Sequence, residues 1–194
     1  MEYLRLNIKP GQVYRRSDLE YYSTAVDRHL NLLVKDGTLL KLIQGIYYAP
    51  KKTKFGVVPP EDNVLVERFL KDESFLLVSP NAFNSLGLGL TQLYNTTWVY
   101  NHKRRGEFTL NGKSFLFKLK SGFPATLSPE YLVVDLLNNL DELAEDYEKI
   151  LKSFQKNMDH FDEYELMKMV QKYGSGEAKK LVKSVLRKSQ SLHV

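Results

Sequence analysis

The chain has 194 residues, of which 43% are apolar and 26% are charged, a composition that excludes disordered, collagen-like and coiled-coil chains. It contains no cysteine, which excludes disulfide bonds, thiolate metal sites and thiol catalysis. No stretch has the roughly 20 consecutive apolar residues of a membrane span, and the first residues lack the apolar run of a signal peptide. We therefore expect a soluble cytoplasmic protein of two small domains, with no membrane partner.

The charged residues are distributed unevenly along the chain. Residues 1–56 carry ten Lys and Arg against five Asp and Glu, whereas residues 128–165 carry three against eleven. Residues 166–194 are basic again, with seven against one. Because regions of opposite charge attract different partners, we expect the basic N-terminal part and the acidic part to contact different molecules.

The first fifty residues contain the strongest signals for helix and strand boundaries. Ser17 and Glu20 have the spacing of a capping box, which predicts a short helix over 18–22. A second helix is predicted over 25–36, because Gly37 is the residue type that ends helices in the left-handed conformation.

The predicted helix 25–36 is amphipathic. At about 100° per residue, one face collects its apolar side chains, which are Val26, Leu30, Leu33 and Val34. The opposite face collects polar side chains, which are Thr24, Arg28, Asn31 and Lys35. The apolar face is expected to pack on the first helix and leave the polar face in solvent.

Two apolar runs follow this helix, at 38–43 and 46–48, and Gln44-Gly45 joins them as in a tight β-hairpin. Helix, short turn, helix and two-stranded hairpin is the order of a winged helix-turn-helix. We therefore predict such a DNA-binding domain over 1–52. The following segment, 53–62, is rich in proline and lysine and is predicted to be a linker.

Residues 63–194 are predicted to form a second, mixed domain. The strands expected there are 74–79, 96–100, 107–110 and 113–120, and Asn111-Gly112 is a strong hairpin signal between the last two. From Ser128-Pro129, a helix cap with a first-turn proline, the rest is predicted to be helical. The predicted fold class is α+β, with an N-terminal winged helix-turn-helix, a small antiparallel sheet and a C-terminal helical bundle.

The sequence carries no motif that is typical of an enzyme. Gly112-Lys113-Ser114 ends like a phosphate-binding loop, but Glu107 stands where that motif requires glycine. The four histidines lack the spacing of a metal site. We therefore expect no catalytic residues, no metal ion and no cofactor.

The polar face of the predicted helix 25–36 has the chemistry that reads DNA. Arg28 can pair with guanine, Asn31 with adenine, and Asp27 can accept a hydrogen bond from cytosine. The arginines before the first helix suit a phosphate, and the hairpin side chains suit the backbone or a minor groove. The residues expected to contact DNA are Arg15, Arg16, Thr24, Asp27, Arg28, Asn31, Lys35, Lys41 and Gln44.

The segment LNLLVKDGTLLKLIQGIYYAPKKTKFG, followed by VSPNAFNSLGL and a strand-rich middle, resembles the AbiE-type abortive-infection antitoxins of bacteria. The resemblance implies a winged-helix regulator that binds its own double-stranded operator DNA and represses transcription. It also implies that the C-terminal domain counters a nucleotidyltransferase toxin, in a type IV toxin–antitoxin system that does not require a stable complex of the two proteins. Carried over by position, the resemblance implies that the residues facing DNA are Arg15, Arg16, Thr24, Arg28, Asn31, Lys35 and Lys41.

Two other interpretations fit the same sequence. The winged helix could direct a nucleic-acid-processing enzyme to DNA, or it could serve as a protein-docking module. A homodimer is consistent with a repressor, because many repressors bind paired half-sites.

Overall fold

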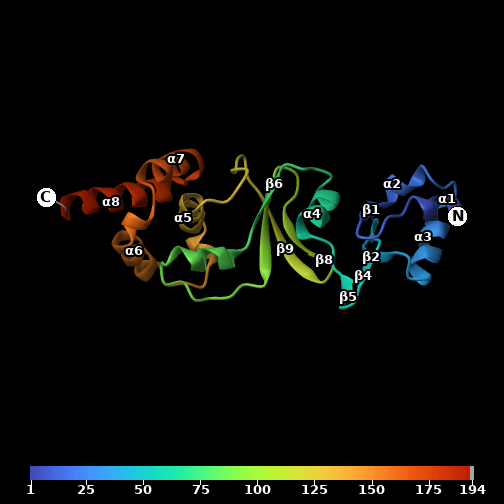
Figure 1. Cartoon of the computed structure of the whole chain (residues 1–194). Helices are drawn as coiled ribbons and strands as arrows, with labels where there is room; N and C mark the ends of the chain where they lie inside the picture. The colour runs from blue at the N-terminus through green and yellow to red at the C-terminus, as the bar shows by residue number, and fades with distance from the viewer. Residues whose placement is uncertain (193–194) are drawn as a thin grey trace. The chain divides into compact units, whose positions relative to one another are not determined.

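The computed structural model describes residues 1–192, and the chain is a mixed α+β protein, as predicted (Figure 1). It divides into two compact units. Unit 1 comprises Met1–Phe75 and Glu107–Ser114, and unit 2 comprises Leu76–Gly106 and the chain from Phe115 onward. His193, one of the four histidines considered above, lies outside the described residues.

Unit 1 begins with alternating short helices and strands. In chain order they are α1 (Glu2–Leu6), β1 (Val13–Arg15), α2 (Arg16–Glu20), α3 (Val26–Lys35), β2 (Leu40–Ile43), β3 (Ile46–Tyr48), β4 (Lys51–Thr53), β5 (Gly56–Val58) and α4 (Asp62–Leu70). The predicted second helix and the predicted hairpin are therefore confirmed, as α3 and β2–β3.

The core of unit 1 forms around α3. Leu30 and Leu33 are fully buried, and Val26 is 7% exposed, which confirms the predicted apolar face. They pack with buried side chains from α1, α2, the turn after α3 and strand β3, which are Leu4, Leu19, Leu39 and Tyr47. Burying a leucine contributes roughly 1.5–3 kcal/mol, so this face fixes the rotation of α3 about its axis.

A three-stranded antiparallel sheet, in the order β1-β3-β2, completes this part of unit 1. Gly45 adopts φ +77° in the turn between β2 and β3, a conformation that glycine adopts without strain. Strand β1 was not expected from the sequence. With three residues, it is too short to show an alternating pattern.

The predicted capping box was wrong in its residues. Helix α2 begins at Arg16, and the Arg15 backbone N–H donates to the Asp18 carboxylate at 2.9 Å. The reason is that Arg15 is still paired with Ile46 in the sheet, so the chain can turn into a helix only after it. The acceptor three residues later is therefore Asp18 and not Glu20.

The segment 53–62, expected to be a linker, contains β5 and the first residue of α4. Strands β4 and β5 form an antiparallel hairpin, and residues 51–59 are all exposed. Since no residue of this hairpin faces a core, the sequence shows no alternation there that would predict strands. Helix α4, also unexpected, lies against β1, and its buried residues include Leu65 and Val66.

The largest sheet has four strands in the order β6-β7-β9-β8, and each predicted strand is present in it. The strands are β6 (Phe75–Val78), β7 (Thr96–Asn101), β8 (Gly106–Leu110) and β9 (Lys113–Leu119). Asn111 and Gly112 both have positive φ, as the predicted two-residue turn requires.

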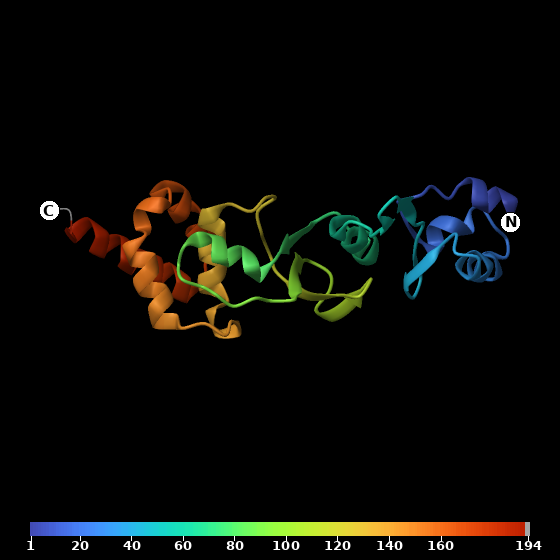
Figure 2. The ribbon, with the colours of Figure 1, turned by 60° about the horizontal axis from the view of Figure 1, so that its bottom comes forward.

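The C-terminal part is helical, as predicted (Figure 2). Its helices are α5 (Pro129–Asn138), α6 (Tyr147–Lys156), α7 (Glu163–Tyr173) and α8 (Gly176–Leu192), with the short 3-10 helices η2 (Leu140–Glu142) and η3 (Met158–His160). A further 3-10 helix, η1 (Pro80–Leu86), lies earlier in the chain, between β6 and β7. The hydroxyl of Ser128 accepts a hydrogen bond from the backbone N–H of Tyr131 and so caps α5. Helix α5 contacts η1, α7 and α8, which explains why it is apolar nearly all round.

Among residues 1–192, every helix is too short or too polar to span a lipid bilayer.

Candidate functional site

The exposed face of α3 presents three polar side chains in a row. Arg28, Asn31 and Lys35 lie three and four residues apart, on the side of the helix opposite the buried Leu30 and Leu33. Within residues 1–192, none of the three side chains forms a hydrogen bond or an ion pair. Their donors and acceptors are therefore available to another molecule.

Three further predicted residues are also exposed. Thr24 lies in the turn before α3, Lys41 lies on β2, and Gln44 lies in the turn between β2 and β3. As on α3, their side chains have no hydrogen-bonding partner in the described part of the chain. Six of the nine predicted residues are thus exposed, and their side chains make no polar contact with another described residue.

Arg16 and Asp27, both predicted to contact DNA, form an ion pair with each other. The guanidinium donates to both carboxylate oxygens of Asp27, from Nε to Oδ1 and from Nη2 to Oδ2, at 2.6 Å each. Arg16 also pairs with Glu20 one turn along α2. This two-bond geometry ties α2 to the first turn of α3, and charge-assisted bonds of this kind are strong.

The ion pair changes the electrostatics of the α3 face. The hydrogen bonds from Arg16 lower the pKa of the Asp27 carboxyl, so Asp27 stays ionised and its charge is compensated by Arg16. The row Arg28, Asn31 and Lys35 consequently carries a positive charge that no acidic side chain offsets through an ion pair within residues 1–192.

Arg15, the remaining predicted residue, is half-buried between β1 and α2. Its Nε atom is buried and has no hydrogen-bond partner among the described residues. The backbone N–H of Arg15 is used in capping α2, so Arg15 positions this helix.

Unit 2 contains a basic loop that the sequence reasoning did not identify. Asn101 is 1% exposed, and its Oδ1 accepts from the backbone N–H groups of Lys103 and Arg104 at 2.9 and 2.6 Å. The His102 ring stacks on Phe123, with centroids 4.9 Å apart. The loop 102–105 is thereby held in one conformation. Its signal in the sequence is the run of four basic residues HKRR.

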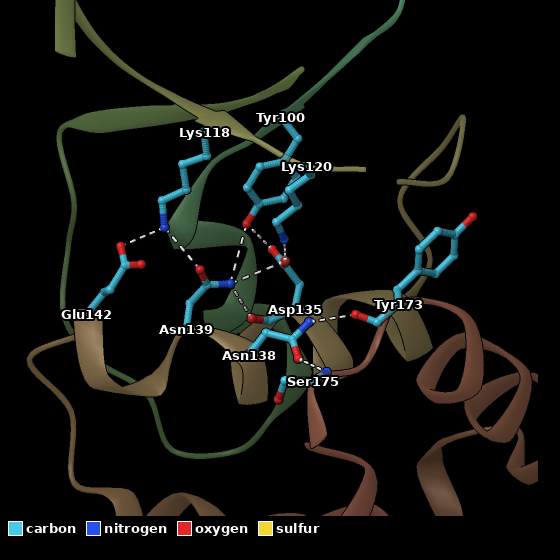
Figure 3. Close-up of polar contacts among 9 residues, drawn as sticks. All are labelled: Tyr100, Lys118, Lys120, Asp135, Asn138, Asn139, Glu142, Tyr173 and Ser175. Carbon is cyan, nitrogen blue, oxygen red and sulfur yellow. Dashed lines mark hydrogen bonds and ion pairs between the residues drawn. The ribbon is translucent and has the colours of Figure 1, made fainter. Parts of the chain in front are cut away.

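A buried polar network lies between β7, β9 and α5 in unit 2 (Figure 3). Asp135 is fully buried, and it accepts hydrogen bonds from the hydroxyl of Tyr100 and from Nζ of Lys120, at 2.7 Å each. The Asn139 amide donates to the Asp135 carbonyl at 2.6 Å, and its oxygen accepts from Lys118 at 3.0 Å. The Lys120 ammonium also lies 3.5 Å from the centroid of the Tyr100 ring.

The network borders a cavity of about 610 Å³ that Tyr131, Asn138 and Tyr173 help to line. Burial raises the pKa of Tyr100 and of Tyr131, so both hydroxyls stay neutral, and that of Tyr100 donates to Asp135. Asp135 already has a cation and a hydroxyl as partners. These interactions suit a structural joint between the sheet and α5.

The described residues also contain no group of three His, Asp or Glu side chains that could hold a metal ion.

Comparison with known proteins bears on the fold. No family model and no curated protein matches the sequence. A crystal structure of the RV2827C protein from Mycobacterium tuberculosis is similar to this chain, with a TM-score of 0.57 and 15% sequence identity over 96% of this chain and 74% of that chain. At this level of identity the similarity concerns the fold alone, and it supports the mixed α+β architecture.

The Arg16–Asp27 pair predicts a pH effect. Because the folded-state pKa of Asp27 lies below its usual value of 3.8, the pair stabilises the protein above pH 3.8, and this contribution is lost as the pH falls through the folded-state pKa. We expect Arg16→Gln to return the pKa of Asp27 toward 3.8 in an NMR titration of the carboxyl carbon. The control Lys35→Gln, two turns along α3, should leave it in place. Identical titrations of wild type and Arg16→Gln would contradict the pairing.

The buried network predicts a large effect on stability. We expect Asp135→Ala to destabilise the protein by roughly 3–5 kcal/mol in urea unfolding, because it leaves the Lys120 ammonium beside a buried hydroxyl without its counter-charge. Glu142→Ala is the matched control, since this carboxylate pairs with Lys118 but is 55% exposed, and it should cost about 1 kcal/mol or less. Equal losses of unfolding free energy in Asp135→Ala and Glu142→Ala would contradict the conclusion that the buried carboxylate contributes more to stability than the exposed one.

Proposed function

We propose that unit 1 is a winged helix-turn-helix that binds double-stranded DNA in a sequence-dependent manner. The observation that carries the proposal is the row Arg28, Asn31 and Lys35, exposed and without intramolecular polar partners on a helix whose other face is fully buried. The order α2, α3, β2 and β3 supports it, because in such domains the second helix of the motif enters the major groove.

Each exposed side chain then has a role that follows from its donors. Arg28 pairs with the two acceptors of guanine and Asn31 with the N6 and N7 atoms of adenine. Thr24 and Lys35, at the two ends of α3, contact phosphates and set the register of the helix in the groove. Lys41 and Gln44 on the hairpin contact the backbone or the adjacent minor groove.

Arg16 and Asp27 receive a different role from the one expected from the sequence. Their mutual ion pair holds α2 against α3, so both act as positioning residues for the reading helix. A cytosine contact by Asp27 would use the carboxylate lone pairs that Arg16 leaves unoccupied.

We further propose that the protein is an AbiE-type antitoxin that acts in the cytoplasm as a repressor of its own operator and counters a nucleotidyltransferase toxin. The support is the sequence resemblance over the segments that form α3, the β2–β3 hairpin and η1. Unit 2, which has its own core, would supply the activity against the toxin. No residue can be assigned to it. A homodimer would give paired half-sites about one helical turn apart on the operator.

The experiment is a fluorescence-anisotropy titration on the DNA upstream of the coding sequence and on scrambled DNA of the same length. We expect Arg28→Ala and Asn31→Ala to weaken binding to the upstream DNA by roughly 1–3 kcal/mol, which is about 5- to 150-fold. Binding to scrambled DNA should change less, because that binding depends mainly on phosphate contacts.

Lys152→Ala is the matched control, because this lysine is also exposed but lies on α6. It should bind like the wild type. Equal losses on both DNAs for Arg28→Ala would contradict base reading. A wild-type protein without salt-dependent DNA binding would contradict the proposal and favour a protein-docking role for unit 1.

A further inference from the structure

The β4–β5 hairpin has features that the proposed helix-turn-helix does not use. Lys51, Lys52 and Lys54 lie within its eight residues, which contain no acidic side chain. All residues from 51 to 59 are exposed, so the hairpin contributes no side chain to a core. An exposed two-stranded ribbon with three cations is complementary to a polyanion.

The tip of this hairpin presents an aromatic ring to solvent. Phe55 is 100% exposed. The hydroxyl of Thr53 accepts a hydrogen bond from the Phe55 backbone N–H at 3.2 Å and donates to the Gly56 carbonyl at 3.0 Å. Gly56 has φ +113°, which other residues rarely adopt. The turn is thus fixed with Phe55 as its outermost side chain.

The base of the hairpin is anchored to the sheet of unit 1. The hydroxyl of Tyr48, a buried residue of β3, donates to the Val58 carbonyl at 2.6 Å. Ala49, one residue beyond β3, makes two backbone hydrogen bonds with the turn before β1. Its carbonyl accepts from the Gly11 N–H at 2.7 Å, and its N–H donates to the Gln12 carbonyl at 2.9 Å. The ribbon therefore projects from a fixed point in the same unit as α3.

We propose that the β4–β5 hairpin is a second DNA contact of unit 1, which enters a groove and inserts Phe55 between base pairs so that the duplex bends. This inference rests on the proposed DNA binding of unit 1. A two-stranded ribbon fits a DNA groove, and apolar side chains such as phenylalanine act as wedges that unstack one base step and kink the duplex.

The distribution of the lysines favours a groove over a flat acidic surface. Because side chains alternate along a strand, Lys51 and Lys52 point to opposite faces of the ribbon. A ribbon in a groove lies between two phosphate backbones, so cations on both faces find phosphates. Phe55, ahead of them at the tip, reaches the bases.

The test measures two properties of the complex with the upstream DNA. One is the affinity of the protein for this DNA, and the other is the bend of the DNA, measured by energy transfer between dyes at its two ends. We expect Phe55→Ala to weaken binding roughly five- to hundredfold, the usual effect of losing one stacked aromatic, and to reduce the bend. Lys52→Gln should lower the slope of log affinity against log salt by about one and keep the bend. Phe55→Trp should keep both properties, and its fluorescence should be quenched by DNA, whereas the buried Trp98 supplies a constant background.

Tyr164→Ala is the matched control, because this aromatic ring is 75% exposed but lies on α7. It should change neither affinity nor bend. If the wild type binds DNA and Arg28→Ala weakens it while Phe55→Ala alters neither property, the hairpin proposal is overturned and the α3 proposal stands. If the wild type binds no DNA, both are overturned. Phe55→Ala that binds DNA normally but fails to bind an acidic protein partner would also overturn the hairpin proposal.

Discussion

Burial of one face of α3 determines what the other face can do. Leu30 and Leu33 are fully enclosed by the core of unit 1, so α3 cannot rotate without exposing them. At roughly 1.5–3 kcal/mol for each buried leucine, rotation would remove much of the stability of so small a core. Arg28, Asn31 and Lys35 are consequently held in a defined orientation before any partner arrives. Such preorganisation lowers the entropy cost of recognition.

The Arg16–Asp27 ion pair adds a second constraint at the start of α3. Surface ion pairs contribute little to stability in general, but a two-bond pair between helices fixes geometry as well. It also compensates the acidic charge nearest to the reading face. In the proposed DNA-binding role, the same two residues therefore act indirectly, by position and by charge.

Local signals made much of this fold predictable, and non-local contacts account for what was missed. The cap at Ser128, the turns at Gly45 and Asn111-Gly112, and the amphipathic pattern of α3 each depend on residues close in sequence. The Arg16–Asp27 pair joins residues eleven positions apart whose contact depends on how α2 crosses α3. Likewise, pairing of Arg15 with Ile46 decided where α2 begins. The β4–β5 hairpin could not be predicted in this way. None of its side chains is buried, so its sequence shows no alternation of apolar and polar residues.

Amide NMR during a titration with the upstream duplex shows directly whether the exposed face of α3 contacts DNA. We expect the largest shifts on α3, the turn at Gln44 and the tip at Phe55, with small changes in α5–α8. Shifts confined to unit 2, or shifts spread evenly over both units, would contradict this contact.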